Sequence, residues 1–421
     1  MLNLKNIHPV SSLIRLLLCF WPILLVGCDQ SAADVNSETA VDLPRIAYAS
    51  YLWHEDEAVP LTAAIDDFMQ ITNSYVLVEA AETVPKTLRN QLAAGMGPDV
   101  LVGLSYTEMA ELADAGLLYD LSDFDNELAN YQLDQIDALT YNDKLYGLPF
   151  MANTTVLFYN TDVVQTAPRS LNQLAAAASN GQAIAIPVDF EHAFWGLGAF
   201  GGQVFDREGR PIPTTESYAA WFRWLISAQS KPGIVMDDDL DFLKTKFIDG
   251  EVAFLIAPIN IYRELTTAMG EAIINVAPIP GVEYAPDPET PETTLIRSAV
   301  PLLSIEVIAF NKAANEDQIR LGIELAQFLN NPTVQRKLVL EQPNRAPTNL
   351  QVAIQLGLSE VGNAIVRQRR TGVIIPLSRH AQFQQFSQAA DTIYLQVLEG
   401  GLTANEAANA LSNLLDRSFK D

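Results

Sequence analysis

The chain has 421 residues, and 49% of them are hydrophobic, so it can bury a large core and is not a disordered chain. Asp and Glu number 51 against 26 Lys and Arg, which gives a formal net charge of -25 at pH 7. Because clustered Lys and Arg bind nucleic acids and anionic membrane surfaces, this acidic balance argues against both as partners.

The N-terminus has the pattern of an export signal. Lys5 and Arg15 precede an apolar run over residues 16–27, which is shorter than the about 20 apolar residues that span a bilayer. The sequence Leu25-Val26-Gly27-Cys28 is similar to the lipobox of bacterial lipoproteins, in which the cysteine is acylated and becomes the new N-terminus. We therefore expect a lipoprotein signal peptide over residues 1–27 and a lipid on Cys28.

A polar segment follows the expected lipid. Residues 28–43 contain few large apolar side chains, so they are expected to form a flexible tether. The predicted location is the periplasm, with the lipid at the outer face of the cytoplasmic membrane, and Asp29 resembles a retention signal for the inner membrane. The sequence has two cysteines. Cys19 lies in the predicted signal peptide and Cys28 is the expected lipid attachment site, so no pair remains for a structural disulfide.

Strand and helix patterns alternate after the tether. Strands are predicted at Arg45–Tyr51, Tyr75–Val78 and Pro98–Val102, and apolar residues at helical spacing lie between them. This order predicts a mostly parallel sheet with helices on both faces.

The segment Tyr141–Val164 is predicted to cross between two parts of the molecule. It reads as a strand at Tyr146–Phe150, a polar break at Met151–Thr154 and a second strand at Thr155–Tyr159. Pro149 cannot donate a hydrogen bond to a sheet, so the first strand is expected to end there or to lie at an edge. A second crossing is predicted at Leu302–Phe310.

The remaining elements are predicted from local patterns. Ala183–Pro187 is expected to be a strand and Asp189–Trp195 a loop, whereas Pro286–Glu292 is rich in proline and acid and is expected to be a solvent loop. Thr403-Ala404-Asn405-Glu406 has the spacing of a capping box and predicts the start of a helix.

Several motifs resemble a known family. The residues 143–149 (Asp-Lys-Leu-Tyr-Gly-Leu-Pro) and 157–162 (Leu-Phe-Tyr-Asn-Thr-Asp) resemble the first inter-lobe hinge of bacterial extracellular solute-binding proteins of ATP-binding cassette (ABC) importers. Residues 97–100 (Gly-Pro-Asp-Val), 247–256 and 277–281 resemble further segments of the same family, in its maltose-binding branch. The resemblance extends from about Arg45 to the C-terminus.

The resemblance implies an α/β, two-lobed, type II periplasmic-binding-protein-like fold. Each lobe is then a mostly parallel sheet with flanking helices, and each lobe is discontinuous in sequence. The expected boundaries are residues 44–150 with 304–350 for the first lobe, and 151–303 with 351–421 for the second.

Ligands of open α/β sheets bind beyond the carboxyl ends of the strands, and clefts between domains favour pockets. A sugar needs carboxylates and amides for its hydroxyls and aromatic rings for its apolar faces. The candidates for the first role are Glu55, Asp99, Asn153 and Asn260; those for the second are Trp53, Trp195, Tyr262 and Phe383.

Two departures from the maltose-binding branch weaken the case for maltodextrin as the solute. That branch has Gly-Pro-Trp-x-Trp where this chain has residues 257–262, Ala-Pro-Ile-Asn-Ile-Tyr, so both tryptophan positions are aliphatic. Asn153 also stands where that branch often carries a carboxylate.

We expect a monomeric, lipid-anchored receptor that captures a small solute, a sugar or oligosaccharide being favoured, and delivers it to the transmembrane subunits of an ABC permease. No catalytic residues and no cofactor are expected. An alternative is a two-lobed lipoprotein that acts as a sensor or partner-binding subunit, with Ile259 and Ile261 filling the cleft.

Two further alternatives have weaker support. Acidic runs at Asp56-Glu57 and Asp237-Asp238-Asp239 leave open a glycoside-acting enzyme, because such enzymes use paired carboxylates. His54, His192 and His380 lie in segments predicted to surround the cleft, but no two of them have the spacing of a recognised metal-ligand motif, so a polar contact to the sugar or a surface position is favoured over a metal site.

Overall fold

The structure is a computed structural model of the chain, and it describes residues 45–55, 57–80, 86–124, 133–206, 210–285, 294–355 and 357–420. The predicted signal peptide, Cys28, the tether and the acidic segment 286–292 lie outside the described residues. Among the described helices, none has the length and apolar content needed to cross a bilayer.

The strands and helices alternate through most of the chain, as predicted. The strands are β1 (Arg45–Tyr51), β2 (Ser74–Ala80), β3 (Val100–Ser105), β4 (Thr140–Tyr141), β5 (Lys144–Leu145), β6 (Gly147–Asn160), β7 (Ile184–Pro187), β8 (Ile234–Asp237), β9 (Phe254–Pro258), β10 (Ile274–Ala277), β11 (Val282–Tyr284), β12 (Leu295–Arg297), β13 (Leu302–Phe310), β14 (Ala346–Pro347) and β15 (Val373–Ile374). The helices are α1 (Val59–Thr72), α2 (Lys86–Ala93), α3 (Tyr106–Asp114), α4 (Leu133–Leu139), α5 (Leu171–Ser179), α6 (Phe190–Ala199), α7 (Thr215–Gln229), α8 (Leu240–Ile248), the short 3-10 helix η2 (Ile259–Ile261), α9 (Tyr262–Met269), α10 (Glu316–Leu329), α11 (Pro332–Glu341), α12 (Glu360–Arg369), α13 (Leu377–Leu398) and α14 (Ala404–Ser418).

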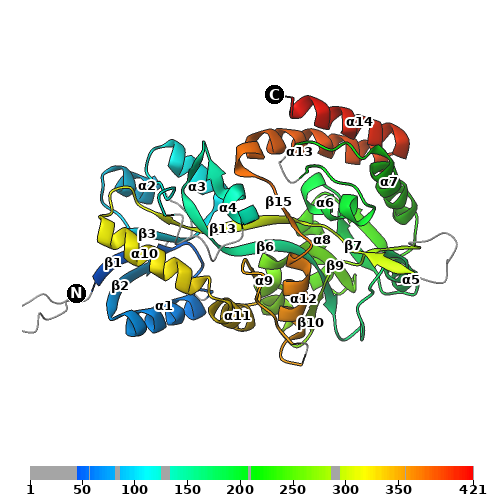
Figure 1. The fold of residues 1–421 in the computed structure, drawn as a ribbon. Coiled ribbons are helices and arrows are strands. Elements are labelled where there is room, and N and C mark those ends of the chain that lie inside the picture. Colours follow the sequence, from blue (N-terminus) through cyan, green and yellow to red (C-terminus); the bar gives the residue numbers. More distant parts are fainter. Residues whose placement is uncertain are drawn as a thin grey trace, which may run out of the picture. The chain divides into compact units, whose positions relative to one another are not determined.

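The main strands form one hydrogen-bonded path in the order β2-β1-β3-β13-β6-β9-β7-β8 (Figure 1). Strand β1 is parallel to β2 and β3 at one end of the path, and β7 is parallel to β8 and β9 at the other end. We call these two groups, with their helices, the first and the second lobe. Between them, β13 and β6 run antiparallel to each other and to their outer neighbours β3 and β9.

The predicted break in the crossing segment is wrong. Strand β6 continues from Gly147 to Asn160 without interruption, and Pro149 lies inside it rather than at its end. The proline is tolerated because the register with β13 shifts beside it: Met151 pairs with Glu306 and Pro149 with Val307, so Phe150 is an extra residue. Such a bulge leaves positions without a ladder hydrogen bond, which suits a residue that has no N–H.

Strand β3, on the other side of β13, also has a bulge, and it lies beside the same residues of β13. Ser105 and Leu104 of β3 pair with Glu306 and Val307, and the next pair joins Val102 to Ile308, so Gly103 is the extra residue. Its backbone has a φ of 82°, which glycine adopts readily because it has no Cβ. Both neighbours of β13 are therefore bulged where the chain passes between the lobes.

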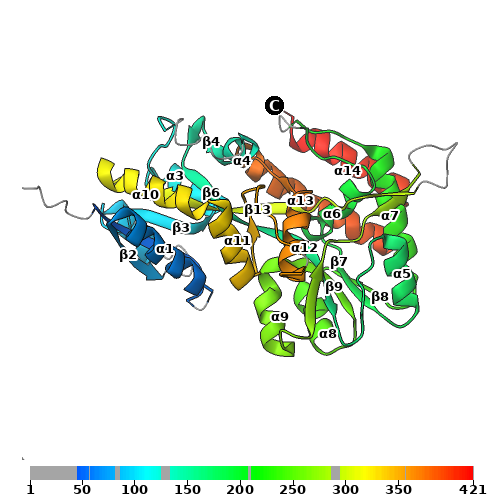
Figure 2. The same ribbon diagram turned by 60° about the horizontal axis from the view of Figure 1, so that its bottom comes forward.

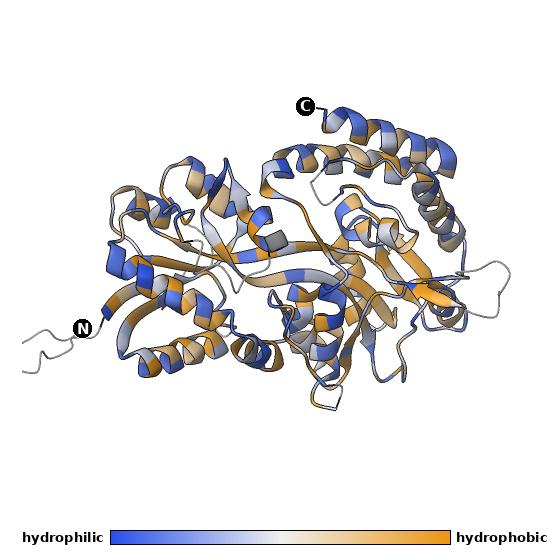
Figure 3. Cartoon of the chain, in the orientation of Figure 1, coloured by the Kyte–Doolittle hydropathy of each residue, from blue (hydrophilic) through white to orange (hydrophobic). Residues whose placement is uncertain are grey.

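Helices cover both faces of the second-lobe sheet (Figure 2). In β6, β7 and β9 successive residues alternate between two buried clusters: Phe158 and Leu255 belong to the cluster that includes α8 and α9, while Leu157 and Ile256 belong to the cluster with α5, α6, α7, α13 and α14. Strands buried on both faces are predominantly hydrophobic, and the hydropathy colouring shows this for the central strands (Figure 3).

Two local predictions differ in outcome. Thr403 caps α14 in a complete capping box with Glu406, as predicted. The segment Asp189–Trp195, predicted to be a loop, is instead the N-cap and first turns of α6. The Asp189 side chain accepts a hydrogen bond from the backbone N–H of His192, which stabilises a helix start.

Candidate functional site

A cavity of about 240 Å³ lies where the two lobes meet, and we call it the cleft cavity. Its lining comes from the start of α3, from the neighbouring strands β6 and β13, and from α6 and α13. The lining residues are Tyr106, Thr107, Asn153, Thr154, Thr155, Glu191, His192, Pro258, Leu302, Leu303, Ser304, Ile375, His380, Phe383 and Gln384.

Helix α3 places a first-lobe tyrosine at the cavity. Ser105 ends β3 and forms a capping box with Glu108, so Tyr106 is the first residue of the helix. The Tyr106 hydroxyl lies 3.1 Å from Nδ1 of His380 on α13, and the two rings meet edge to face with centroids 5.2 Å apart. This pair joins the two sides of the cavity.

Helix α6 contributes a histidine that is paired with a carboxylate. Nδ1 of His192 lies 2.8 Å from Oδ2 of Asp189. Burial favours neutral His192, but the hydrogen bond to Asp189 and the charges of Asp189, Glu191 and Asp391 outweigh it, so the pKa of His192 is raised. Burial likewise works to raise the pKa of Asp189, but His192 outweighs it and the pKa is lowered.

Two buried polar atoms at the cavity have no hydrogen-bond partner among the described residues. They are Oγ1 of Thr154 and Nε2 of His380. Burial lowers the pKa of His380, which favours the neutral imidazole. Buried polar groups are nearly always hydrogen-bonded, and an unpaired one costs about 1–3 kcal/mol. A ligand with hydroxyl groups could supply both missing partners.

The structure does not bring Trp53 to the cleft cavity. The Trp53 side chain is 3% exposed and stacks on Phe150 with ring centroids 5.3 Å apart. Its Nε1 donates to Oε2 of Glu306 over 2.8 Å, and Arg345 lies over the ring at 4.1 Å. Its polar and aromatic contacts are thus made with residues of the protein itself, including Phe150, the extra residue of the β6 bulge.

Asp99 lies at the other end of its strand. It precedes β3, whereas Ser105 and Tyr106 follow the strand toward the cleft cavity. The Asp99 carboxylate accepts hydrogen bonds from the Tyr48 backbone N–H and from Nε2 of Gln318. Desolvation raises its pKa despite the bond from Tyr48. It serves the packing of the first lobe in this structure.

Of the other predicted residues, Asn153 and Phe383 line the cleft cavity. Trp195 is fully buried against Trp221, with ring centroids 5.0 Å apart. Tyr262 is 6% exposed, and burial raises its pKa to about 12. These two do not line the cavity.

The last two predicted residues are exposed. Glu55 lies in the loop between β1 and α1, outside the lining of the cleft cavity. Asn260 lies in η2, and its backbone N–H is 3.4 Å from Oδ1 of Asn153. Asn260 is therefore beside a lining residue without being one itself.

Sequence reasoning missed several lining residues. Thr154 lies in the predicted polar break and was not among the candidates. His192 and His380 were considered as polar sugar contacts but were not chosen as site residues, and both line the cavity. Tyr106 was missed altogether, although the Ser105-x-x-Glu108 spacing that follows a strand is a capping-box signal for a helix start.

The three histidines do not come together. His192 and His380 line the cleft cavity, but His54 lies in the exposed loop after β1. Within the described ranges there is no group of three or more His, Cys, Asp or Glu residues arranged to hold a metal ion.

The sequence matches the family described as bacterial extracellular solute-binding protein over residues 63–357. The maltodextrin-binding protein MdxE of Bacillus subtilis is 22% identical over 355 residues, which cover 78% of this chain and 79% of the relative. A maltooligosaccharide ABC transporter solute-binding lipoprotein of Streptococcus pneumoniae is 21% identical over 447 residues and covers 94% of both chains.

The fold is also similar to solved structures. The maltose-binding periplasmic protein MalE of Listeria monocytogenes, solved in complex with maltose, matches with a TM-score of 0.67 at 18% identity, over 88% of this chain and 97% of that chain. This similarity confirms the predicted α/β, two-lobed, type II architecture.

Proposed function

The chain belongs to the bacterial extracellular solute-binding protein family, and we propose that it captures a sugar or oligosaccharide between its two lobes for an ABC importer. The relatives reported above include sugar-binding proteins and a solute-binding lipoprotein of an ABC transporter. We propose the same class of ligand and of partner for this chain.

The observation that carries the proposal is the pair of unpartnered polar atoms at the cleft cavity. Thr154 lies on a crossing strand and His380 on a second-lobe helix; both residues line the cavity between the lobes, and Thr154 Oγ1 and His380 Nε2 are buried beside it. A sugar hydroxyl can donate and accept, so it can satisfy either atom. Tyr106 and Phe383 add aromatic surface for the apolar face of a sugar ring.

The size of the cavity bears on the length of the sugar. Ligand pockets usually have volumes of about 300–1,000 Å³, and the cleft cavity has about 240 Å³. The described lining contains no tryptophan. We therefore favour a short saccharide, and a longer one would require the cleft to open further.

Opening and closing are proposed to occur where β6 and β13 cross. Gly147–Thr154 and Leu302–Ile308 contain both partners of the bulged region, and bulges locally disrupt a ladder. For the lobe boundaries we propose residues 44–150 with 304–350 for the first lobe and 151–303 with 351–421 for the second, as predicted from the sequence. Bound solute then stabilises the closed state by its differential affinity for that state, and the permease recognises closure.

We further propose that Cys28 carries the lipid and that residues 28–43 tether the receptor at the outer face of the cytoplasmic membrane. The lipobox-like sequence at the end of an apolar run, the polar segment that follows it and the lipoprotein relative support this. We propose that the receptor is monomeric and that no bond of the solute is broken.

Titration calorimetry of the purified full chain in detergent tests the proposal. The panel consists of glucose, galactose, maltose, maltotriose, a galactooligosaccharide, an amino acid mixture and zinc chloride. We expect saturable binding of at least one saccharide, together with a decrease in radius of gyration by X-ray scattering. Absence of binding by every saccharide at millimolar concentration would contradict the sugar-receptor function.

A sensor without a solute is the second candidate. One observation favours it: Trp53, one of the aromatic side chains predicted to stack on a sugar, is held inside the protein by Glu306 and Arg345. The proposed filling of the cleft by Ile259 is less well supported, because this residue is buried and does not line the cleft cavity. A chain that binds no member of the panel but is retained by purified permease would favour the sensor.

A further inference from the structure

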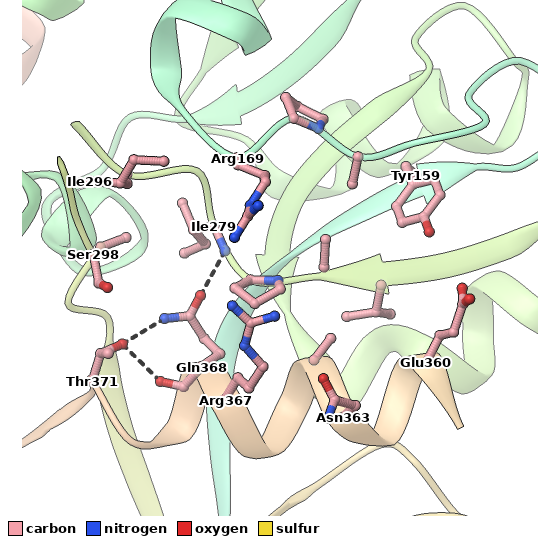
Figure 4. A pocket seen from close by; sticks show the side chains of 18 of the residues that line it. Tyr159, Arg169, Ile279, Ile296, Ser298, Glu360, Asn363, Arg367, Gln368 and Thr371 are labelled. Atoms are coloured by element: carbon pink, nitrogen blue, oxygen red, sulfur yellow. Dashed lines mark hydrogen bonds between the residues drawn. The ribbon is translucent and has the colours of Figure 1, made fainter. Parts of the chain in front are cut away.

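The second lobe holds a larger cavity that none of the preceding argument uses. It has a volume of about 700 Å³ and shares no lining residue with the cleft cavity. Its walls come from the end of β6, the loop before α5, the connection from β10 to β11, strand β12 and helix α12 (Figure 4). We call it the α12 cavity.

Buried hydrogen bonds fix the walls of the α12 cavity. Gln368 is 2% exposed, and its Oε1 accepts a hydrogen bond from the Ile279 backbone N–H over 2.7 Å. Its Nε2 donates to Oγ1 of Thr371 over 2.9 Å (Figure 4). Because an amide oxygen and nitrogen are both engaged, α12 and the β10–β11 connection are held in one position.

The backbone that carries Arg169 is held just as firmly. The Arg169 N–H donates to Oε1 of Gln173 over 2.9 Å, and its carbonyl accepts from the Gly281 N–H over 3.1 Å. The guanidinium group is not part of these bonds. It is presented by a fixed backbone and points into the cavity (Figure 4).

Two cationic side chains point into the same space. Figure 4 shows the guanidinium groups of Arg169, from the loop before α5, and of Arg367, from α12, on opposite sides of the cavity. Among the described residues neither guanidinium has an ion-pair or hydrogen-bond partner. Arg370, also in the lining, only approaches the carbonyls of Leu350 and Val352 at 3.5 and 3.4 Å.

The cavity has almost no negative charge of its own, although the protein carries a net charge of -25. Among the lining residues Glu360 is the one carboxylate, and its Oε2 already accepts from Nδ2 of Asn275 over 2.8 Å. Facing guanidinium groups repel each other, so this arrangement favours an anion between them. Arginine forks match phosphate oxygens with two parallel hydrogen bonds each.

We infer that the α12 cavity binds a divalent oxyanion of the phosphate class, held between Arg169 and Arg367. The oxygen atoms accept hydrogen bonds from both guanidinium groups. Apolar lining residues such as Val276, Ile279 and Ala299 leave room for a small organic group on the anion. The ligand class is therefore inorganic phosphate or a small phosphate monoester.

Calorimetry with inorganic phosphate and, separately, methyl phosphate tests the inference on the full chain at constant ionic strength. We expect saturable binding to the wild type, and about ten-fold weaker binding in each of R169Q and R367Q, because each loses a charge-assisted hydrogen-bonding group. R336Q is the matched control: Arg336 is exposed on α11 and does not line the cavity. Its affinity for phosphate should equal that of the wild type.

Thermal unfolding without phosphate separates loss of the site from loss of the fold. R169Q and R367Q should unfold at or slightly above the wild-type temperature, since each relieves repulsion, and phosphate should raise the midpoint of the wild type more than that of either variant. Binding of inorganic phosphate alone assigns the free ion, and binding of both probes assigns the ester. Absence of wild-type binding, or equal binding by an R169Q/R367Q double variant, would overturn the inference.

Discussion

The guanidinium carbon of Arg345 lies 4.1 Å from the centroid of the Trp53 ring. The same guanidinium group forms ion pairs with Glu306 at 2.8 Å and with Glu57 at 2.9 Å, and its side chain is 11% exposed. Trp53 and Glu57 belong to the loop after β1, and Glu306 belongs to crossing strand β13. The network therefore fixes a first-lobe loop to the strand on which the lobes are proposed to hinge.

Removal of the arginine should leave two nearly buried carboxylates without their counter-ion. We expect R345M to lower the free energy of unfolding by about 3–5 kcal/mol, the usual cost of breaking a buried ion pair from one side. Urea unfolding at pH 7 measures this. R89Q, which breaks the exposed pair Arg89–Glu111, should cost less than about 1 kcal/mol. Equal costs for the two variants would contradict a structural role for Arg345.

The bulge at Gly103 should be intolerant of any side chain. Its φ is 82°, and a Cβ there would lie 2.7 Å from Nε1 of Trp53. We expect G103A to cost at least about 3 kcal/mol in urea unfolding and to change the near-ultraviolet circular dichroism of Trp53, through backbone strain and a displaced ring.

A second glycine provides the control for G103A. Gly250 has a φ of 74°, but a Cβ there would meet nothing within 4 Å. G250A should therefore cost only the about 1–2 kcal/mol of the left-handed backbone conformation. If G103A is no more destabilised than G250A, the contact between Trp53 and Gly103 does not constrain the strand.

Elements that depend on short stretches of adjacent residues were predicted correctly from the sequence. Strand β1 and the crossing strand β13 have the predicted bounds, and the Thr403 capping box starts α14 as expected. Pro149 misled the prediction because its place in β6 depends on a register shift against β13, about 150 residues away in the sequence. No pattern near Pro149 contains that information.

The structure brings some of the predicted site residues to the cleft cavity and places others away from it. Asn153 and Phe383 reach the cleft cavity, but Trp53 is held inside the protein by Glu306 and Arg345, which are distant in sequence. Asp99 precedes β3, so it lies at the opposite end of the strand from Ser105 and Tyr106, which lead to the cleft cavity. Side-chain direction depends on such long-range contacts, which a single sequence does not show.

The Thr154 hydroxyl is expected to lower the stability of the free protein and to raise its affinity for the saccharide. T154V replaces a buried, unpartnered hydroxyl group with a methyl group of similar shape, so we expect the free chain to gain about 1 kcal/mol in urea unfolding. The saccharide identified by titration should bind about five- to ten-fold more weakly, since it loses one hydrogen bond.

T333V is the matched control, because Thr333 is exposed on α11 and lies outside the cleft cavity. It should change the affinity for the saccharide by less than about two-fold, as expected for a surface substitution away from the site. A T154V variant that binds the saccharide as tightly as the wild type would show that this hydroxyl makes no bond to it.

The His192–Asp189 pair should make stability depend on pH. Because the pKa of His192 is raised on folding, its contribution is present below the unfolded pKa of about 6.5 and is lost as the pH rises through the folded pKa. The pKa of Asp189 is lowered, so its contribution is present above the unfolded value of about 3.9 and is lost at lower pH.

H192Q should therefore lower the unfolding midpoint most at about pH 5–6, by the equivalent of at most about 1 kcal/mol, and have little effect at about pH 9. Scanning calorimetry of both chains across this range measures the difference. In a D189N background the effect of H192Q should be small at every pH, and a difference between H192Q and the wild type that stays constant from about pH 5 to 9 would contradict the assignment.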